Sequence, residues 1–132
     1  MYEYKVKEVT KVVDGDTVDV LIDLGFDISV LKRVRLAGID APELHSKDAV
    51  EKQLGDDARV KLMGLFAGRT VTVKTEIVDS TDKYGRVLGW FFVEGTSIND
   101  KLVAEGYAWA YDGGTKHKDF EALKAKRAAN VG

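Results

Sequence analysis

The sequence contains no cysteine, one proline and two histidines among its 132 residues. The absence of cysteine excludes disulfide bonds, thiolate metal sites and a cysteine nucleophile. No apolar run is long enough to span a bilayer, and the first residues, Met1 to Val6, lack the apolar stretch of a signal peptide. We therefore expect a cytoplasmic protein with no membrane contact. The alternative that this chain is the mature form of a secreted protein is not excluded by the sequence.

The chain also lacks a strong excess of charge of one sign. Its 20 lysine and arginine residues stand against 22 aspartate and glutamate residues, which gives a net charge of −2. Proteins that wrap nucleic acid non-specifically usually carry a strongly basic face, so this class is disfavoured. An enzyme with a small, locally positive site remains open, because carboxylates that bind a metal lower the formal charge without making the loaded site negative. The length predicts one domain, residues 1–132, which we expect to be monomeric.

Alternating apolar and polar residues predict five strands. The alternation is clear over 18–24, 28–36, 70–77 and 87–93. The first strand, over 4–13, is less regular, and a slip near Glu8 and Val9 predicts a bulge. Five twisted strands of this kind can close into a small barrel, for which the OB-fold is the best-known case.

Three helices complete the predicted fold. Apolar residues three to four positions apart predict a helix from Val50 that ends near Gly68. A capping signal and a glycine stop predict a second helix over 97–106. The third is predicted over 115–129, with Phe120 and Leu123 facing inward. The expected class is therefore α+β, mainly β: a five-stranded OB-fold barrel with three helices.

Three short segments carry the candidate chemistry: Asp14-Gly15-Asp16-Thr17, the stretch from Arg35 to Glu43, and Lys83-Tyr84-Gly85-Arg86. Each one alone also fits an ordinary turn, because Asp-Gly is a hairpin signal, proline fixes the backbone and glycine permits a positive φ. Together they supply three carboxylates and two guanidinium groups at predicted strand ends. The functional interpretation rests on this combination.

The carboxylates predict a site for a hard divalent cation. Asp16 and Asp40 could share the cation, and the carbonyl of Ala41 could be a third oxygen ligand because the following proline restricts the backbone. So few protein ligands predict weak binding, at the loose end of the calcium range. Glu43 is then free to orient or deprotonate a water.

The two arginines predict a phosphate site. Guanidinium groups bind two oxygens of a phosphate at once, and Arg35 and Arg86 could neutralise charge that develops on the phosphoryl oxygens. A cation, a water-orienting carboxylate and two guanidinium groups suit metal-assisted hydrolysis of a phosphodiester.

The three segments, in this order, resemble the staphylococcal nuclease family, also called thermonucleases, over roughly residues 5–111. The resemblance implies an OB-fold barrel, one calcium ion, and cleavage of DNA and RNA at the P–O5′ bond, which leaves 3′-phosphates. By position, it implies the following roles: calcium binding by Asp16, Asp40 and Ala41, water activation by Glu43, phosphate binding by Arg35 and Arg86, and nucleotide contacts by Lys83 and Tyr84.

The resemblance also places nucleotide contacts near the end of the matching region. We expect Tyr111, and after it Trp109, to contact a phosphate or a base. Two features depart from the family. The chain is slightly acidic where many members are basic, and its short tail after Arg127 predicts a last helix that docks less firmly.

Two other functions remain as alternatives. The first alternative is a catalytically inactive OB-fold module that binds nucleic acid or another protein. Such a module should have lost at least one of the site carboxylates or arginines, and the sequence retains all five: Asp16, Asp40, Glu43, Arg35 and Arg86. A plain single-strand binder would use a stacking platform such as Trp90, Phe91 and Phe92, but we expect at least two of these in the core.

The remaining polar candidates are expected to be structural or solvated. His45 and His117 match no zinc spacing and are expected to be exposed. The basic residues of the last segment are expected to form a solvated helix face: Lys116, Lys118, Lys124, Lys126 and Arg127.

Overall fold

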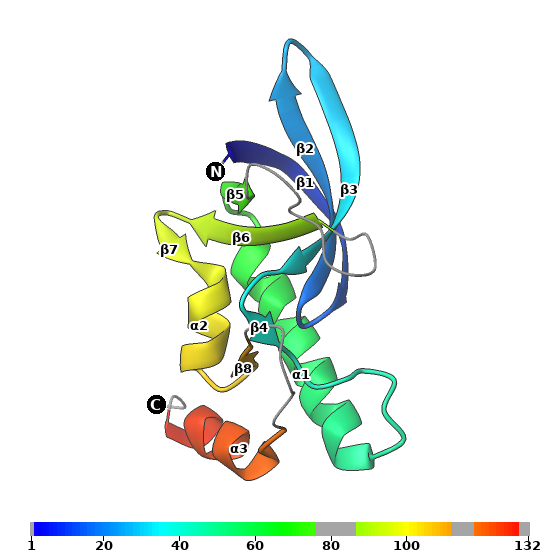
Figure 1. Ribbon diagram of the computed structural model, residues 1–132, viewed down its shortest axis with the longest axis vertical. Helices are drawn as coiled ribbons and strands as arrows, with labels where there is room; N and C mark the ends of the chain where they lie inside the picture. Colours follow the sequence, from blue (N-terminus) through cyan, green and yellow to red (C-terminus); the bar gives the residue numbers. More distant parts are fainter. Residues whose placement is uncertain (1, 76–86, 112–117, 130–132) are drawn as a thin grey trace.

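The structure is a computed structural model that describes residues 2–75, 87–111 and 118–129. In this part of the chain, the predicted class is confirmed: long strands form a barrel, and helices lie at one end of it (Figure 1). The long strands are β1 (Tyr2–Asp14), β2 (Thr17–Gly25), β3 (Ile28–Leu36), β5 (Val71–Thr75) and β6 (Val87–Val93). The helices are α1 (Ala49–Phe66), α2 (Ile98–Ala104) and α3 (Phe120–Ala129). Three two-residue strands complete the order: β4 (Ile39–Asp40), β7 (Thr96–Ser97) and β8 (Trp109–Ala110).

The barrel closes through one parallel contact. The strands follow the order β3-β2-β1-β5-β6 with antiparallel neighbours, and β3 then pairs with β6. This pairing sets Val34 against Val87 and Arg35 against Leu88. The predicted irregularity of the first strand is confirmed, because its register against β2 shifts between Val6 and Glu8 and again between Val9 and Lys11. Such shifts bend a strand, so β1 can pair with both β2 and β5.

The core lies between the barrel and α1. Val18, Val20 and Val34 are fully buried, and the rings of Phe66 in α1 and Phe91 in β6 meet edge to face at 5.4 Å. The helix stripe predicted from Val50 begins one turn later than expected, because Val50 is 46% exposed. The buried stripe is Leu54, Ala58, Leu62 and Leu65.

The expectation that at least two of the aromatic residues Trp90, Phe91 and Phe92 in β6 lie in the core was wrong. Only Phe91 is buried, whereas Trp90 and Phe92 are partly exposed. Strand alternation explains the result, because neighbours of an inward residue must point to the other face. The Lys74 ammonium lies 4.7 Å from the centre of the Phe92 ring and covers part of it.

The last helix is α3, and its expected weaker docking stays a prediction. It begins at Phe120, and residues 115–117 lie outside the described part of the chain. Leu123 is buried as expected, and Phe120 is partly exposed, with its ring 5.6 Å from that of Trp109.

Arg127 is the main anchor of this helix and not part of a solvated face. Its guanidinium donates to the carbonyls of Leu54 (3.0 Å) and Gly106 (2.7 Å), and it pairs with Asp57 at 3.2 Å. It also lies 4.4 Å from the centre of the Tyr107 ring. Burial lowers the pKa of Arg127. The expected solvated position of this residue was therefore wrong.

His45 is exposed, as predicted, and His117 lies outside the described residues. In the described ranges, no helix has both the length and the apolar character needed to cross a membrane.

Candidate active site

Three of the predicted site residues meet at one end of the barrel because of strand register. The turn between β1 and β2 carries Asp16, and the β2–β3 register sets the next residue, Thr17, opposite Arg35. The Leu36 amide then donates to the Asp16 carbonyl at 2.7 Å. After Leu36 the chain turns at Gly38, which has a φ of +77°, and returns as β4 with Asp40.

A buried asparagine fixes this turn. The Asn99 side-chain amide in α2 donates to the carbonyls of Ala37 (2.8 Å) and Gly89 (3.1 Å), and its oxygen accepts from the Phe91 amide. One side chain thus joins α2, β6 and the chain that leads into Asp40. The sequence indicated only a helix start here, because nothing local shows which carbonyls Asn99 would reach.

Arg35 lies at the centre of the site, between the two aspartates. Its Nη1 is 3.1 Å from Oδ2 of Asp16, and its Nη2 is 3.3 Å from Oδ1 of Asp40. Nη1 also donates to the Leu36 carbonyl at 3.3 Å. The side chains of all three charged residues are at most 10% exposed. A guanidinium that joins two buried carboxylates gives a rigid arrangement with little solvent screening.

The Asp16 carboxyl is the most strongly perturbed group of the site. It accepts hydrogen bonds from the Thr17 hydroxyl (3.1 Å) and the Ala41 amide (2.9 Å). Burial, together with the nearby Asp14 carboxylate, raises the pKa of Asp16 to about 7, while Arg35 and the Ala41 amide act in the opposite direction. Among the described residues, the carboxyl groups of Asp16 and Asp40 lie close to the guanidinium of Arg35, and that of Asp14 lies close to the backbone amide of Asp16.

Asp14 is a contributor to which the sequence analysis gave no role. Its Oδ1 accepts from the Asp16 amide at 3.0 Å, so the first carboxylate of the turn shapes the backbone of the second. The available signal was the Asp-Gly-Asp spacing, because two acids on either side of a tight turn lie close together.

The donors at this site suit a hard cation. Asp16 and Asp40 offer carboxylate oxygens, which calcium and magnesium prefer. Burial first, and the neighbouring Asp14 after it, raise the pKa of Asp16, and a bound cation would favour its ionised form. Within the described ranges, no three Asp, Glu, His or Cys side chains gather closely enough to bind a metal ion.

Glu43 is not part of the Arg35 cluster. It follows β4 in an exposed position, with 61% of its side chain accessible, and its Oε1 is 3.5 Å from the Lys118 ammonium. Lys118 also pairs with the buried Glu51 at 2.9 Å, and Glu51 accepts from the Glu43 amide at 3.3 Å. The expected solvated position of Lys118 was therefore wrong, because this lysine joins the loop after β4 to the start of α1.

The predicted nucleotide-contact residues are only partly placed. Strand β8 pairs with β4 and sets Trp109 opposite Asp40, and the Tyr111 amide donates to the Gly38 carbonyl at 2.8 Å. The backbone of both residues therefore lies beside the site. The Trp109 indole, however, donates to the Asp119 carbonyl at 3.2 Å, next to α3. Lys83, Tyr84 and Arg86 lie outside the described residues.

Comparison with known proteins gives consistent similarities. The family described as staphylococcal nuclease homologue matches residues 33–131. The chain is 37% identical to "Protein ParB" of Escherichia coli over 131 residues, 38% identical to "Micrococcal nuclease" of Shigella flexneri over 113, and 30% identical to "Endonuclease YncB" of Bacillus subtilis (strain 168) over 121. These alignments cover 92%, 79% and 89% of this chain, but only 66%, 57% and 55% of the respective relatives. The chain thus spans less than two thirds of the length of each.

Proposed function

Because the chain belongs to the staphylococcal nuclease family, we propose that it is a calcium-dependent nuclease. The proposed reaction is hydrolysis of phosphodiester bonds in DNA and RNA at the P–O5′ position, which leaves 3′-phosphates. One observation carries the proposal: Asp16 and Asp40 converge on Arg35 in a buried cluster at one end of the barrel. Two endonuclease or nuclease relatives, from Shigella flexneri and Bacillus subtilis, support the same reaction class.

The aspartates of the cluster have the proposed role of holding the cation. Asp16, Asp40 and the Ala41 carbonyl would bind calcium, which supplies Lewis acidity and a template for the phosphate. Arg35 is held by both carboxylates. In this proposal the Arg35 guanidinium would donate N–H groups to the phosphate oxygens of the substrate.

The proposed role of Glu43 is to orient or deprotonate the attacking water. Its exposed carboxylate, held by Lys118, is accessible to water and substrate. For the substrate contacts we propose Tyr111 and Trp109 beside β4, together with the sequence-based candidates Lys83, Tyr84 and Arg86. In this proposal Arg86 is the second phosphate-binding guanidinium.

A cleavage assay tests the proposal. Purified protein is incubated with single-stranded DNA and with RNA, in calcium and in chelator, and the products are examined for 3′-phosphate ends. We expect cutting only with calcium, and at least about a hundredfold lower turnover for Asp40→Ala, because removal of a preorganised charged group costs this much in enzymes. The matched control is Asp100→Ala, which removes an exposed aspartate from α2 and should retain activity.

The alternative function has a distinct outcome. Nucleic acid that binds equally to the wild type and to Asp40→Ala, with no cutting by either, would identify an inactive binding module. Full activity of Asp40→Ala, or full activity in chelator, would contradict the proposed metal-dependent reaction.

A further inference from the structure

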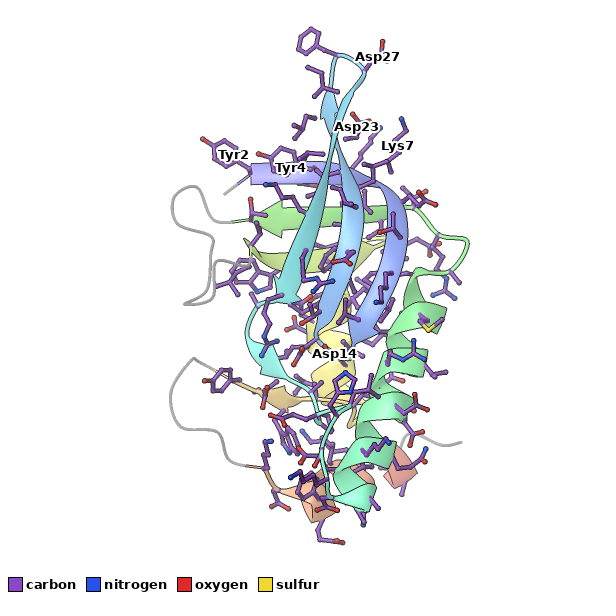
Figure 2. The ribbon with its side chains drawn as sticks, turned by 90° about the vertical axis from the view of Figure 1, so that its right-hand side faces the viewer. Tyr2, Tyr4, Lys7, Asp14, Asp23 and Asp27 are labelled. Atoms are coloured by element: carbon purple, nitrogen blue, oxygen red, sulfur yellow. The ribbon has the colours of Figure 1, made fainter. Side chains whose placement is uncertain are left out.

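A groove of about 590 Å³ lies between β1 and the second half of α1. Its walls are the β1 residues from Val6 to Val12 and, from the helix side, Arg59, Met63 and the chain from Phe66 to Val71. Figure 2 shows this face, with β1 beside α1. None of the residues assigned to the candidate active site lines the groove.

The groove concentrates positive charge. Its lining includes the cations Lys7, Lys11, Arg59 and Arg69, against a single carboxylate, that of Glu8. Lys7, Lys11 and Arg69 are exposed. The acids near these cations are Asp56, which is 3.8 Å from Arg59, and Asp19. The pKa of Asp19 is lowered mainly by its hydrogen bond with Arg33 and to a smaller extent by Lys11. In a chain of net charge −2, such a cluster marks a local site for a polyanion.

The floor of the groove is apolar. Val12 and Phe66 are buried beneath it, and Met63 is 45% exposed beside the Arg59 side chain, which approaches the Met63 sulfur at 3.6 Å. Cations along a groove with an apolar floor suit a single strand, whose phosphates are charged and whose bases are flat and apolar.

The groove starts next to the candidate active site. Lys7 lies near the middle of β1, and Asp14 marks the end of the strand at the candidate site (Figure 2). The turn at Gly15 packs tightly on α1, because a Cβ at this position would be 2.7 Å from that of Ala58. Ala58 directly precedes Arg59, so a strand that leaves the site can pass onto the groove.

We propose that the β1–α1 groove binds the single-stranded nucleic acid that flanks the bond to be cut. This inference rests on the proposed nuclease function and adds a binding subsite to it. The contacts are between the four cations and phosphates of the flanking strand, so they depend on the length of the substrate and on salt and carry little sequence preference.

The test compares two triple variants. The groove variant is Lys7→Gln, Lys11→Gln and Arg69→Gln. The control variant is Lys32→Gln, Lys52→Gln and Lys124→Gln, which removes the same charge from exposed positions outside the groove. All six positions are exposed, so both variants should fold, which circular dichroism checks.

Binding is measured in chelator by fluorescence anisotropy, with a DNA strand of about 16 nucleotides, the upper end of single-strand site sizes on OB-folds. Each lost phosphate contact reduces the slope of log K against log salt by about 0.7, so the groove variant should lose roughly 2 from this slope. The control variant should keep the wild-type slope. Equal slopes for all three proteins would overturn the proposal.

Cleavage separates this inference from the proposed function. With calcium, the groove variant should show a raised KM and an unchanged kcat on the long strand, and wild-type kinetics on a dinucleotide that cannot reach the groove. If the wild type cuts neither substrate, the nuclease proposal fails, while the anisotropy result still decides the groove. If polyglutamate binding depends on the groove cations and strand binding does not, the occupant is an acidic polypeptide and the inference is overturned.

Discussion

The protonation of Asp16 should be visible in the stability of the metal-free protein. Burial beside Asp14 raises the pKa of Asp16 from its usual 3.8 to about 7, so between these values the folded state binds a proton that the unfolded state has lost. This contribution to stability is present below pH 3.8 and is lost as the pH rises through about 7. In chelator, the free energy of unfolding should therefore fall between pH 5 and 8, by roughly 2 to 3 kcal/mol from this group.

Urea unfolding at several pH values, with Asp16→Asn as the comparison, isolates this effect. The asparagine cannot titrate, so the variant should show a flatter profile than the wild type over the same range. Parallel profiles for the two proteins would mean that the carboxyl titrates near its ordinary pKa.

The residues of the site differed in how far the sequence could predict them. The sequence could predict that Asp16, Arg35 and Asp40 meet, because each lies at a strand end, where short motifs fix the local backbone. Their roles stay a prediction. The sequence could not predict the pairing of Glu43 with Lys118, because this pairing depends on how Lys118, just before α3, packs against the loop after β4. Lysine side chains are usually solvated, so Lys118 was expected to be solvated, but tertiary packing places it beside Glu43 and Glu51.

At the scale of elements, the fit of α1 against the site loop depends on one glycine. A Cβ at Gly55 would lie 2.8 Å from the Pro42 carbonyl oxygen and 3.0 Å from backbone atoms of Glu43 and Leu44. Gly55→Ala should therefore displace the loop that carries Glu43. We expect a drop in kcat of at least about tenfold, because small misplacements of catalytic groups reduce rates strongly.

Gly64→Ala in the same helix is the matched control. A Cβ at Gly64 meets nothing within 4 Å, so this variant should keep its activity and gain about 0.5 to 1 kcal/mol from helix propensity. Cleavage kinetics and urea unfolding of both variants check the pair. A wild-type kcat in Gly55→Ala would show that the rate of cleavage does not depend on the position of the loop that carries Glu43.

The attachment of α3 depends on Arg127, which reaches carbonyls of two other segments. Arg127→Ala leaves the Leu54 and Gly106 carbonyls without this donor and removes the guanidinium that packs on the Tyr107 ring. We expect a loss of about 2 to 4 kcal/mol in the free energy of unfolding. Lys124→Ala, in the same helix, removes only an exposed lysine paired at 3.5 Å with an exposed glutamate, and should change stability by less than about 0.5 kcal/mol. Similar effects of both substitutions in urea unfolding would reject the anchoring role.

At the scale of the whole molecule, closure of the barrel places β6 beside the strand that carries Arg35. The β3–β6 contact is parallel and joins segments far apart in the sequence, and it brings the chain at Val87 beside Val34, next to Arg35 (Figure 1). Alternation predicted each strand, and the strand count suggested a barrel, but neither indicates which strand closes on which. The closure and the Asn99 link are therefore features that only the three-dimensional structure reveals.

Calcium binding should stabilise the whole fold, because the proposed ligands come from two segments that unfolding separates. Binding to the native state adds RT ln(1 + [L]/Kd), and a site with few protein ligands has a Kd of about 10⁻⁴ to 10⁻³ M. At about 10 mM calcium, the gain should be roughly 1 to 3 kcal/mol, which raises Tm by several degrees. Asp40→Asn should lose this gain, and Asp100→Asn should keep it. A calcium-induced rise in Tm that is equal in all three proteins would place the ion elsewhere, and no rise in the wild type would contradict the proposed metal site.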